Sequence, residues 1–250
     1  MSVTAIVLAA GAGTRMRSEL PKPLHPVCGR PMVMRVIDAL VDAAPDQVVV
    51  VVGHGAELVT ETLRTMTPDW VTIDTVVQEQ QHGTGHAAAV GMTAVTDDDP
   101  NRTIIVLPGD TPLLQADTIA ALCSARIKRN EAATILSSTL DDPTGYGRIV
   151  RHDGNVVRIV EQRDATDAEL AIREWNTGVY AFAAGLFAPA LAQLRTDNAQ
   201  GEYYLTDVIS LLAGDGHRIG SVITDAEQAH GVNDPEQLAY AEQVMRERLA

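Results

Sequence analysis

Cysteine and long apolar runs are scarce in this sequence. Cys28 and Cys123 are too few for a disulfide framework, and neither lies in a metal-type cysteine pair, so we expect both to be small buried apolar side chains. No apolar run approaches the roughly 18 residues of a membrane-spanning helix, and no basic and then apolar leader begins the chain. These absences predict a cytoplasmic protein that has no membrane partner.

Positive charge is scarce as well. The chain holds 19 Lys and Arg residues against 33 Asp and Glu residues, which gives a formal net charge of −14. Non-specific binding to nucleic acids or anionic membranes relies on a positive field, so this balance argues against both partners. The first 30 residues reverse it, because Arg15, Arg17, Lys22 and Arg30 stand there against Glu19 alone. A local basic site in an acidic protein suits a small anionic ligand.

Lysine occurs only at Lys22 and Lys128. Lys22 lies between two prolines, shortly after an apolar run over 4–10 and a glycine-containing loop over 11–14. A strand that ends in a loop of exposed backbone N–H groups can hold phosphates, and basic side chains supply the missing charge. A lysine at this place, in a chain whose other cations are almost all arginine, predicts a point charge directed at a phosphate. The alternative is a tight turn with surface cations.

Two common phosphate-binding loops do not fit this segment. The dinucleotide fingerprint requires a third glycine where Met16 stands. The helix-nucleating phosphate loop requires Gly-Lys-Ser/Thr where Met16-Arg17-Ser18 stands.

The segment LAAGAGTRMRSELPKPLHPVCGRPM instead resembles the signature of sugar-phosphate nucleotidyltransferases. These enzymes join a nucleoside triphosphate to a sugar 1-phosphate and release pyrophosphate. The resemblance implies that Arg15 and Lys22 are catalytic. It also implies nucleotide contacts from Leu8, Ala9, Ala10, Gly11 and Gly13.

Apolar β-rich runs alternate with helical patterns through the first half of the chain. This alternation predicts an α/β fold, with a Rossmann-like, doubly wound, mostly parallel sheet that binds ligands at the carboxyl ends of its strands. Expected strands cover 4–9, 47–53, 71–78, 103–107 and 132–140, and expected helices cover 31–43, 56–66, 84–95 and 116–129. Pro31 is expected in the first turn of its helix.

The second half changes character. A His-Asp-Gly-Asn turn at 152–155 predicts a hairpin, which marks a smaller β-rich part. Expected strands cover 148–151, 156–161 and 175–182, and expected helices cover 185–194, 203–213 and 235–249. The acidic runs 97–99 and 141–142 are expected to be solvated loops. With no linker in between, we expect one nucleotidyltransferase unit over 1–233, with a nucleotide-binding half of about 1–130, a sugar-binding half of about 131–233 and a C-terminal helix over 234–250.

Gln78 is followed five residues later by Gly83-Thr84-Gly85. A glutamine amide donates to and accepts from a pyrimidine edge, and glycine lets the backbone approach a base. In the family a similar motif reads uracil, which implies nucleotide roles for Gln78, Gly83 and Thr84. A helix start capped by Thr84 is the structural alternative, compatible with the first. His82 and His86 have the spacing of a zinc pair, but Gly-Thr-Gly lies between them and no acidic base follows His82.

Gly109 and Asp110 follow the expected strand over 103–107. A lone aspartate at the carboxyl end of a strand is a natural Mg²⁺ ligand, although it can also cap a turn. The resemblance implies that Gly109 contacts the nucleotide and that Asp110 binds Mg²⁺. The second metal ligand implied by the family is Asn233, in a Gly-Val-Asn segment, so the fold must bring two distant residues together.

Sugars require converging carboxylate, amide and backbone partners. By resemblance, Gly147, Glu161 and Asn176 contact the amino sugar. The run over 198–207 is also similar to the family and is expected to close the sugar pocket, with Thr206 as a contact. A capped helix start is an equal alternative for Glu202 and Thr206.

From Leu8 to Asn233, the sequence resembles the uridylyltransferase domains of certain bacterial bifunctional enzymes. Those enzymes synthesise precursors of peptidoglycan and the cell wall. The resemblance implies Mg²⁺-dependent transfer of UMP from UTP to N-acetylglucosamine 1-phosphate. Pro23 and Pro108 depart from the family's pattern. Three alternatives stay open: an enzyme that uses glucose 1-phosphate with UTP or dTTP, a cytidylyltransferase, and a catalytically silent sugar-nucleotide sensor. Because the chain ends at Ala250 without hexapeptide repeats, no acetyl transfer is expected. The oligomeric state is not determined, and a monomer is compatible with the sequence.

Overall fold

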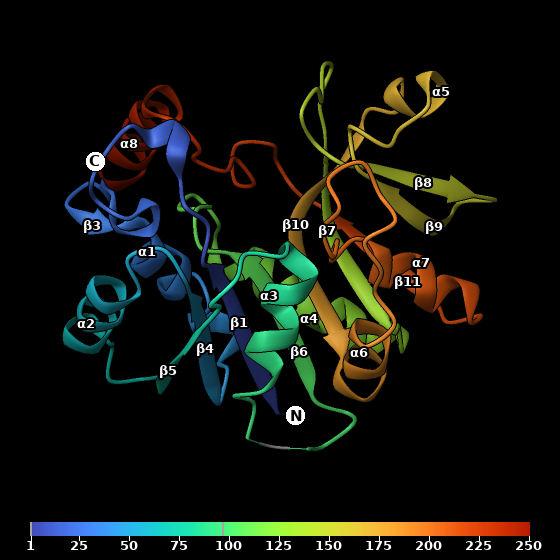
Figure 1. Cartoon of the computed structure of the whole chain (residues 1–250), viewed down its shortest axis with the longest axis horizontal. Coiled ribbons are helices and arrows are strands. Elements are labelled where there is room, and N and C mark those ends of the chain that lie inside the picture. The colour runs from blue at the N-terminus through green and yellow to red at the C-terminus, as the bar shows by residue number, and fades with distance from the viewer. Residues whose placement is uncertain (1, 97) are drawn as a thin grey trace.

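A mixed, mostly parallel sheet organises the protein, whose computed structural model describes residues 2–96 and 98–250 (Figure 1). The strands of its main path are β1 (Val3–Ala9), β4 (Gln47–Val52), β5 (Ile73–Val77), β6 (Thr103–Pro108), β7 (Ala133–Thr139), β10 (Glu174–Ala183) and β11 (Ile219–Ile223). Their order is β11-β7-β10-β6-β1-β4-β5. Within the described residues, β10 alone in this path runs opposite to the others, antiparallel to both β6 and β7.

Helices cover both faces of this sheet (Figure 1). One face packs against α1 (Met32–Asp38), α2 (Ala56–Met66) and α4 (Ala116–Arg129), and the other against α3 (Thr84–Met92), α6 (Ala184–Leu191) and α7 (Asp207–Gly214). Alternate residues of a strand point to opposite faces, so a strand covered on both sides must be apolar at nearly every position. In β1, Ala5 and Val7 enter one core and Ile6 enters the other. The predicted Rossmann-like α/β fold is confirmed.

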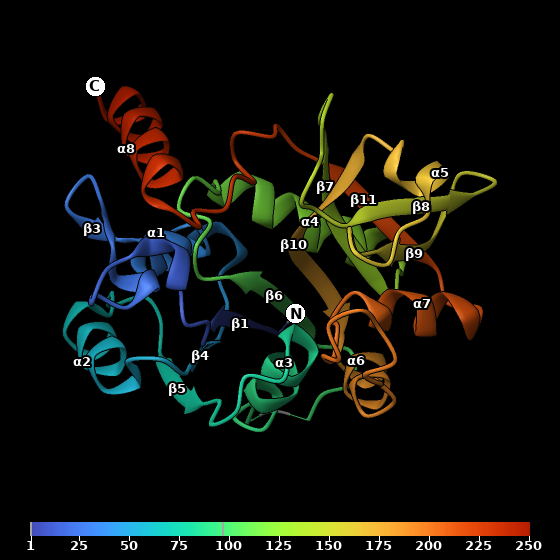
Figure 2. The ribbon, with the colours of Figure 1, turned by 45° about the horizontal axis from the view of Figure 1, so that its top comes forward.

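Two smaller parts extend from the sheet. The hairpin of β8 (Arg148–His152) and β9 (Asn155–Val160) is attached to β10 through β8, and α5 (Asp167–Leu170) follows it. At the other side of the molecule, α8 (Pro235–Leu249) lies against the ribbon of β2 (Pro26–Val27) and β3 (Arg30–Pro31) (Figure 2). The end of the chain therefore packs beside the loop that carries the predicted phosphate-binding residues.

Most predicted elements occur close to their expected bounds, and those over 56–66, 116–129 and 235–249 match them. The helix expected over 31–43 was wrong in its length, because it is divided into α1 and a 3₁₀ turn over Val41–Ala43. Pro31 precedes α1 in extended conformation, with ψ 141°, and does not lie in its first turn. The expected helix start at Tyr203 was also wrong, because the Tyr203 N–H donates to His82 and α7 begins at Asp207.

The remaining expectations concern surface charge, cysteines and membranes. Asp97 lies outside the described residues, and Asp98 is exposed. Cys123 is buried, which raises the pKa of its thiol to about 12, whereas Cys28 is only partly buried. Of the helices that the structure describes, none has both the length and the apolar character of a membrane span.

Replacing Gly91 by alanine should destabilise the fold, because α3 packs against β1 and β4 at this residue. An added Cβ would lie 2.5 Å from Ile6 Cγ2 and 3.0 Å from Val51 Cγ2. Overpacking of this kind costs about 1–3 kcal/mol, and a lower urea midpoint would measure it. Gly214→Ala is the control, since no atom lies within 4 Å of its added Cβ, and it should be neutral or mildly stabilising. Equal midpoints for the two variants would contradict the packing described.

Candidate active site

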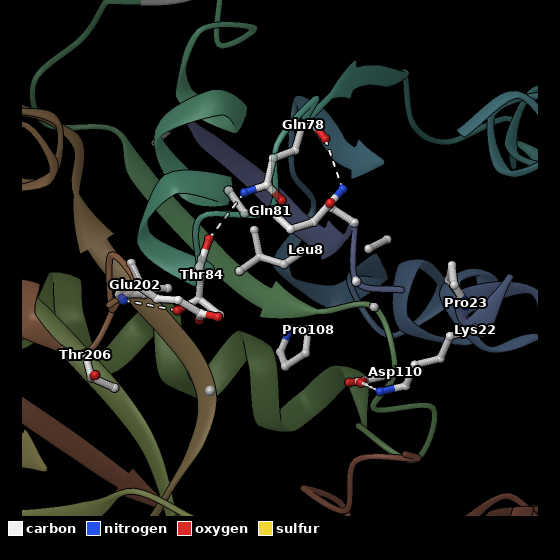
Figure 3. A pocket seen from close by; sticks show the side chains of 18 of the residues that line it. Leu8, Lys22, Pro23, Gln78, Gln81, Thr84, Pro108, Asp110, Glu202 and Thr206 are labelled. Carbon is white, nitrogen blue, oxygen red and sulfur yellow. Dashed lines mark hydrogen bonds and ion pairs between the residues drawn. The ribbon is translucent and has the colours of Figure 1, made fainter. Parts of the chain in front are cut away.

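A cavity of about 400 Å³ lies at the carboxyl ends of β1, β5 and β6 (Figure 3). It is walled by residues from both predicted halves of the chain. Of the predicted site residues, those that line it are Leu8, Ala9, Ala10, Gly11, Lys22, Gln78, Gly83, Thr84, Gly109, Asp110, Glu161, Asn176 and Thr206. Gly13, Gly147 and Asn233 do not line it, but each contacts a residue that does.

The loop after β1 offers free backbone donors. The N–H groups of Gly11, Ala12 and Gly13 donate no hydrogen bond to any other described residue. Gly13 has φ 60°, a conformation that glycine adopts without strain, and an added Cβ there would lie 2.5 Å from Lys22 Cβ. The glycine therefore leaves room for the Lys22 side chain to pass toward the cavity.

Lys22 joins the two predicted metal ligands. Its ammonium forms an ion pair with the Asp110 carboxylate (Figure 3), and Nζ lies 2.8 Å from Oδ1 of Asn233. The turn that carries Asn233 is held in place because the Val232 N–H donates to the Asp110 carbonyl at 2.8 Å. Carboxylate and amide oxygens are the ligands that hard divalent cations prefer. Since these two already converge on one positive charge, the residues fit a divalent metal.

Arg15 lies apart from this cluster. It is exposed in a 3₁₀ turn over Thr14–Met16, outside the residues that line the cavity. Among the described residues it has no hydrogen-bond or ion-pair partner. Its predicted catalytic role stays a prediction.

The segment predicted to contact the base, over 78–85, is bound to a loop from the other half of the chain. Gly83 and Gly85 face Tyr203, and an added Cβ would lie 2.7 Å and 2.9 Å, respectively, from its carbonyl oxygen. The Gly85 N–H donates to that oxygen at 2.8 Å, and the Leu205 N–H donates to the Thr84 hydroxyl at 3.1 Å. Thr84 therefore anchors this loop. The alternative in which it caps α3 was wrong, because Gly83 is the N-cap and has no side-chain partner there.

Polar groups that point at one another form the opposite end of the cavity. The Thr206 hydroxyl donates to Glu161 Oε1 at 3.0 Å, so it does not cap α7. The Asn176 amide donates to the Tyr180 hydroxyl at 2.7 Å, and the Asn176 N–H donates to the Gly147 carbonyl at 2.9 Å. Tyr180 is buried, which raises its pKa, so its own proton remains available to a ligand.

Burial raises the pKa of Glu161. The hydrogen bond from Thr206 opposes this rise, while the negative charges of Asp207 and Asp164 add to it. Burial makes the ionised form of Glu161 unfavourable. A ligand that donates hydrogen bonds from hydroxyl or amide N–H groups would stabilise that form.

Sequence reasoning missed several lining residues. Gln81 lies between Gln78 and Gly83, and its amide donates to the Gln78 carbonyl at 3.3 Å. The others are Pro23, Ala87, Pro108, Gly178 and Tyr180, whereas Glu202 and Leu205 belong to the run over 198–207 that was expected to close the sugar pocket. Tyr180 follows Asn176 by four positions along β10, but a bulge between Asn176 and Val179 changes the alternation, so the strand pattern gave no signal for it.

Comparisons with known proteins identify relatives of this chain. Residues 5–215 match the model of the MobA-like NTP transferase domain. The bifunctional protein GlmU of Streptomyces coelicolor is 47% identical over 247 residues, which cover 98% of this chain and 50% of that protein. GlmU of Brevibacillus brevis is 47% identical over 249 residues, which cover 99% and 52%. The chain thus spans about half the length of the curated relatives it matches.

A solved structure supports the fold. A Bacillus anthracis protein, provisionally named a glucose-1-phosphate thymidylyltransferase and solved with sucrose, superposes with a TM-score of 0.79 at 20% identity. The match covers 98% of this chain and 96% of that one. At this identity the likeness shows the fold alone.

Replacing Glu161 by glutamine should stabilise the protein at neutral pH. The pKa of the wild-type carboxyl is higher in the folded state than its usual 4.5. The stability of the wild type therefore falls as the pH rises from the unfolded-state pKa to the folded-state pKa, because the folded protein resists losing this proton. Glutamine carries no charge and still accepts from Thr206. The thermal midpoint of the variant should exceed that of wild type at pH 7, and the difference should vanish at acidic pH. Glu79→Gln, at an exposed position, is the control; a midpoint difference for Glu161→Gln that does not vary with pH would overturn the assignment.

Proposed function

Because the chain belongs to the family of MobA-like NTP transferase domains, we propose that it transfers UMP from UTP to N-acetylglucosamine 1-phosphate and releases pyrophosphate. The observation that carries the proposal is the convergence of Lys22, Asp110 and Asn233 at a cavity that is also lined by Gln78 and Glu161. A phosphate group bound there would connect a nucleotide at one end with a sugar at the other. The similarity to bifunctional GlmU proteins over nearly all of this chain supports a sugar-phosphate substrate.

Each end of the cavity has the polar groups that its proposed ligand requires. The uridine moiety would lie against the end formed by Gln78, Gly83 and Thr84, beside Leu8, Ala9, Ala10 and Gly109. The N-acetylglucosamine moiety would contact Glu161, Asn176 and Thr206, with Gly147 supporting Asn176 from behind. These groups donate and accept hydrogen bonds, as recognition of a base edge and of sugar hydroxyl and amide groups requires.

The proposed reaction needs no protein nucleophile. An oxygen of the sugar phosphate attacks the α-phosphorus of UTP in line, the new P–O bond forms, and the bond to pyrophosphate breaks. The chain positions the two reactants and neutralises charge. The free N–H groups of Gly11 to Gly13 and the Lys22 ammonium bind phosphate oxygens, and Arg15 adds positive charge from the exposed side of the loop.

We propose that Asp110 and Asn233 hold Mg²⁺ when substrates are bound. When bound, this cation would offset the negative charge of the phosphates. Lys22 would then exchange its contact with these two oxygens for one with a phosphate.

Other substrates remain testable alternatives. The Pro-Lys-Pro-Leu segment over 21–24 keeps glucose 1-phosphate with UTP or dTTP open. A cytidylyltransferase and a non-catalytic sugar-nucleotide sensor are further candidates, although the presence of both Lys22 and Asp110 favours an enzyme.

Pyrophosphate release should be greatest with UTP and N-acetylglucosamine 1-phosphate. The assay pairs UTP, dTTP and CTP with N-acetylglucosamine 1-phosphate and glucose 1-phosphate in the presence of Mg²⁺, and release should stop when EDTA is added. A preference for glucose 1-phosphate would move the protein to another sugar substrate. Tight binding of a sugar nucleotide without release from any pair would favour the sensor.

Lys22→Ala should lower kcat roughly 100- to 1,000-fold, the effect of removing one charge-stabilising donor. Circular dichroism should show the fold retained, because Lys22 lies in a short turn outside the sheet. Lys128→Ala is the matched control, since it removes the other lysine from an exposed position on α4 and should leave kcat unchanged. Near-normal turnover of the Lys22 variant would exclude the ammonium from the reaction.

A further inference from the structure

We propose that His86 is a positioning residue that fixes the amide of Gln78 so that this glutamine only accepts hydrogen bonds from the base, which selects uracil over cytosine. This inference rests on the proposed function, because it concerns the end of the cavity assigned to the base. His86 itself does not line the cavity.

The orientation of the Gln78 amide follows from its neighbours. Gln78, labelled in Figure 3, is 3% exposed. Its Nε2 lies 3.3 Å from the carbonyl oxygen of Gly83 and 2.9 Å from Nδ1 of His86. A backbone carbonyl can only accept, so the atom that faces it must be the amide nitrogen. Gln78 therefore donates to Gly83.

The same contact determines the state of His86. Since Nε2 of Gln78 is a donor without a lone pair to offer, Nδ1 of His86 must accept from it. The imidazole is then neutral and carries its proton on Nε2. Both hydrogens of the Gln78 amide are thereby used, one on Gly83 and one on His86.

The remaining polar atom of this amide is free to accept a hydrogen bond from a ligand in the cavity. Oε1 of Gln78 has no partner among the described residues and is not a buried unpaired atom, while Gln78 lines the cavity. Gly83 and Thr84 also line the cavity, and their backbone N–H groups donate to no described residue. The residues that line this part of the cavity thus offer one side-chain acceptor and two backbone donors.

That pattern matches one pyrimidine better than the other. Uracil presents an N–H donor at position 3 between two carbonyl acceptors, whereas cytosine presents an acceptor at position 3 and an amino group at position 4. Reading cytosine at position 3 would require Gln78 to donate, and its donors are occupied. Without His86 the amide would lose one of the two partners that prevent it from turning.

The test compares selectivity in His86 variants. His86→Phe keeps an aromatic ring but removes the acceptor, and His86→Asn retains an acceptor near the place of Nδ1. The ratio of kcat/KM for UTP to kcat/KM for CTP should fall about tenfold in His86→Phe, the effect of one hydrogen bond, and should recover in His86→Asn. The KM for N-acetylglucosamine 1-phosphate should not change in either variant.

His82→Phe is the matched control. His82 lies in the same loop, but its ring contacts Gln80 Oε1 at 2.7 Å and not Gln78, so the UTP to CTP ratio should stay at the wild-type value. A wild-type ratio in folded His86→Phe, or an equal loss of ratio in His82→Phe, would overturn the proposal.

A second measurement keeps the two proposals separate. The ¹⁵N resonances of His86 in the wild-type protein report its tautomer directly, and we expect an unprotonated Nδ1 and a protonated Nε2. A proton on Nδ1 would refute the positioning role whether or not the protein turns over substrate. If pyrophosphate release fails with every pair, calorimetric affinities for UTP and CTP in the same variants replace the kinetic ratio.

Discussion

The antiparallel pairing of β10 with β6 is the constraint on which the cavity depends. Tyr180 of β10 lies opposite Val106 of β6, so the beginning of β10 meets the carboxyl end of β6. A parallel strand in that position would place its own carboxyl end there. Because β10 runs in reverse, Asn176 and Gly178 stand beside Pro108, and an added Cβ at Gly178 would lie 3.3 Å from Pro108 Cγ. One strand direction thus joins the residues proposed to contact the sugar to the edge proposed to bind the nucleotide.

A second connection closes the cavity on the other side. The loop before α7 and the start of α3 exchange backbone hydrogen bonds through Tyr203, His82 and Gly85. At Gly83 there is no space for a side chain, since the carbonyl of Tyr203 and the Cβ of Glu202 lie within 3.0 Å of where a Cβ would be. The residues proposed to read the base and those proposed to close the sugar pocket are therefore held by one set of contacts. A shift of either loop would alter both ends of the cavity.

The cavity combines groups of different charge, as a sugar nucleotide would require. It holds the Lys22 ammonium with its two oxygen partners, in a protein whose net charge is −14. It also offers neutral amide groups at Gln78 and Gln81 and the Glu161 carboxyl, whose pKa is raised by burial. A ligand that carries both phosphate and neutral polar groups matches this combination.

The sequence by itself determined the elements and the motifs at their ends. Apolar runs such as 47–52 and the periodicity of 56–66 are local signals. When a glycine loop or a Gly-Asp pair directly follows a strand, the end of that strand determines where the motif lies. The tertiary structure decided what depends on distant partners. β11, with glycine at its second position, is a strand because it pairs with β7, and α7 starts late because Tyr203 donates to His82. The meeting of Lys22 with Asn233, the place of Arg15 outside the cavity wall and the direction of the Gln78 amide could not be read from the sequence either. Each is fixed by atoms that only folding brings within hydrogen-bonding distance, whereas strands and helices follow from neighbours along the chain.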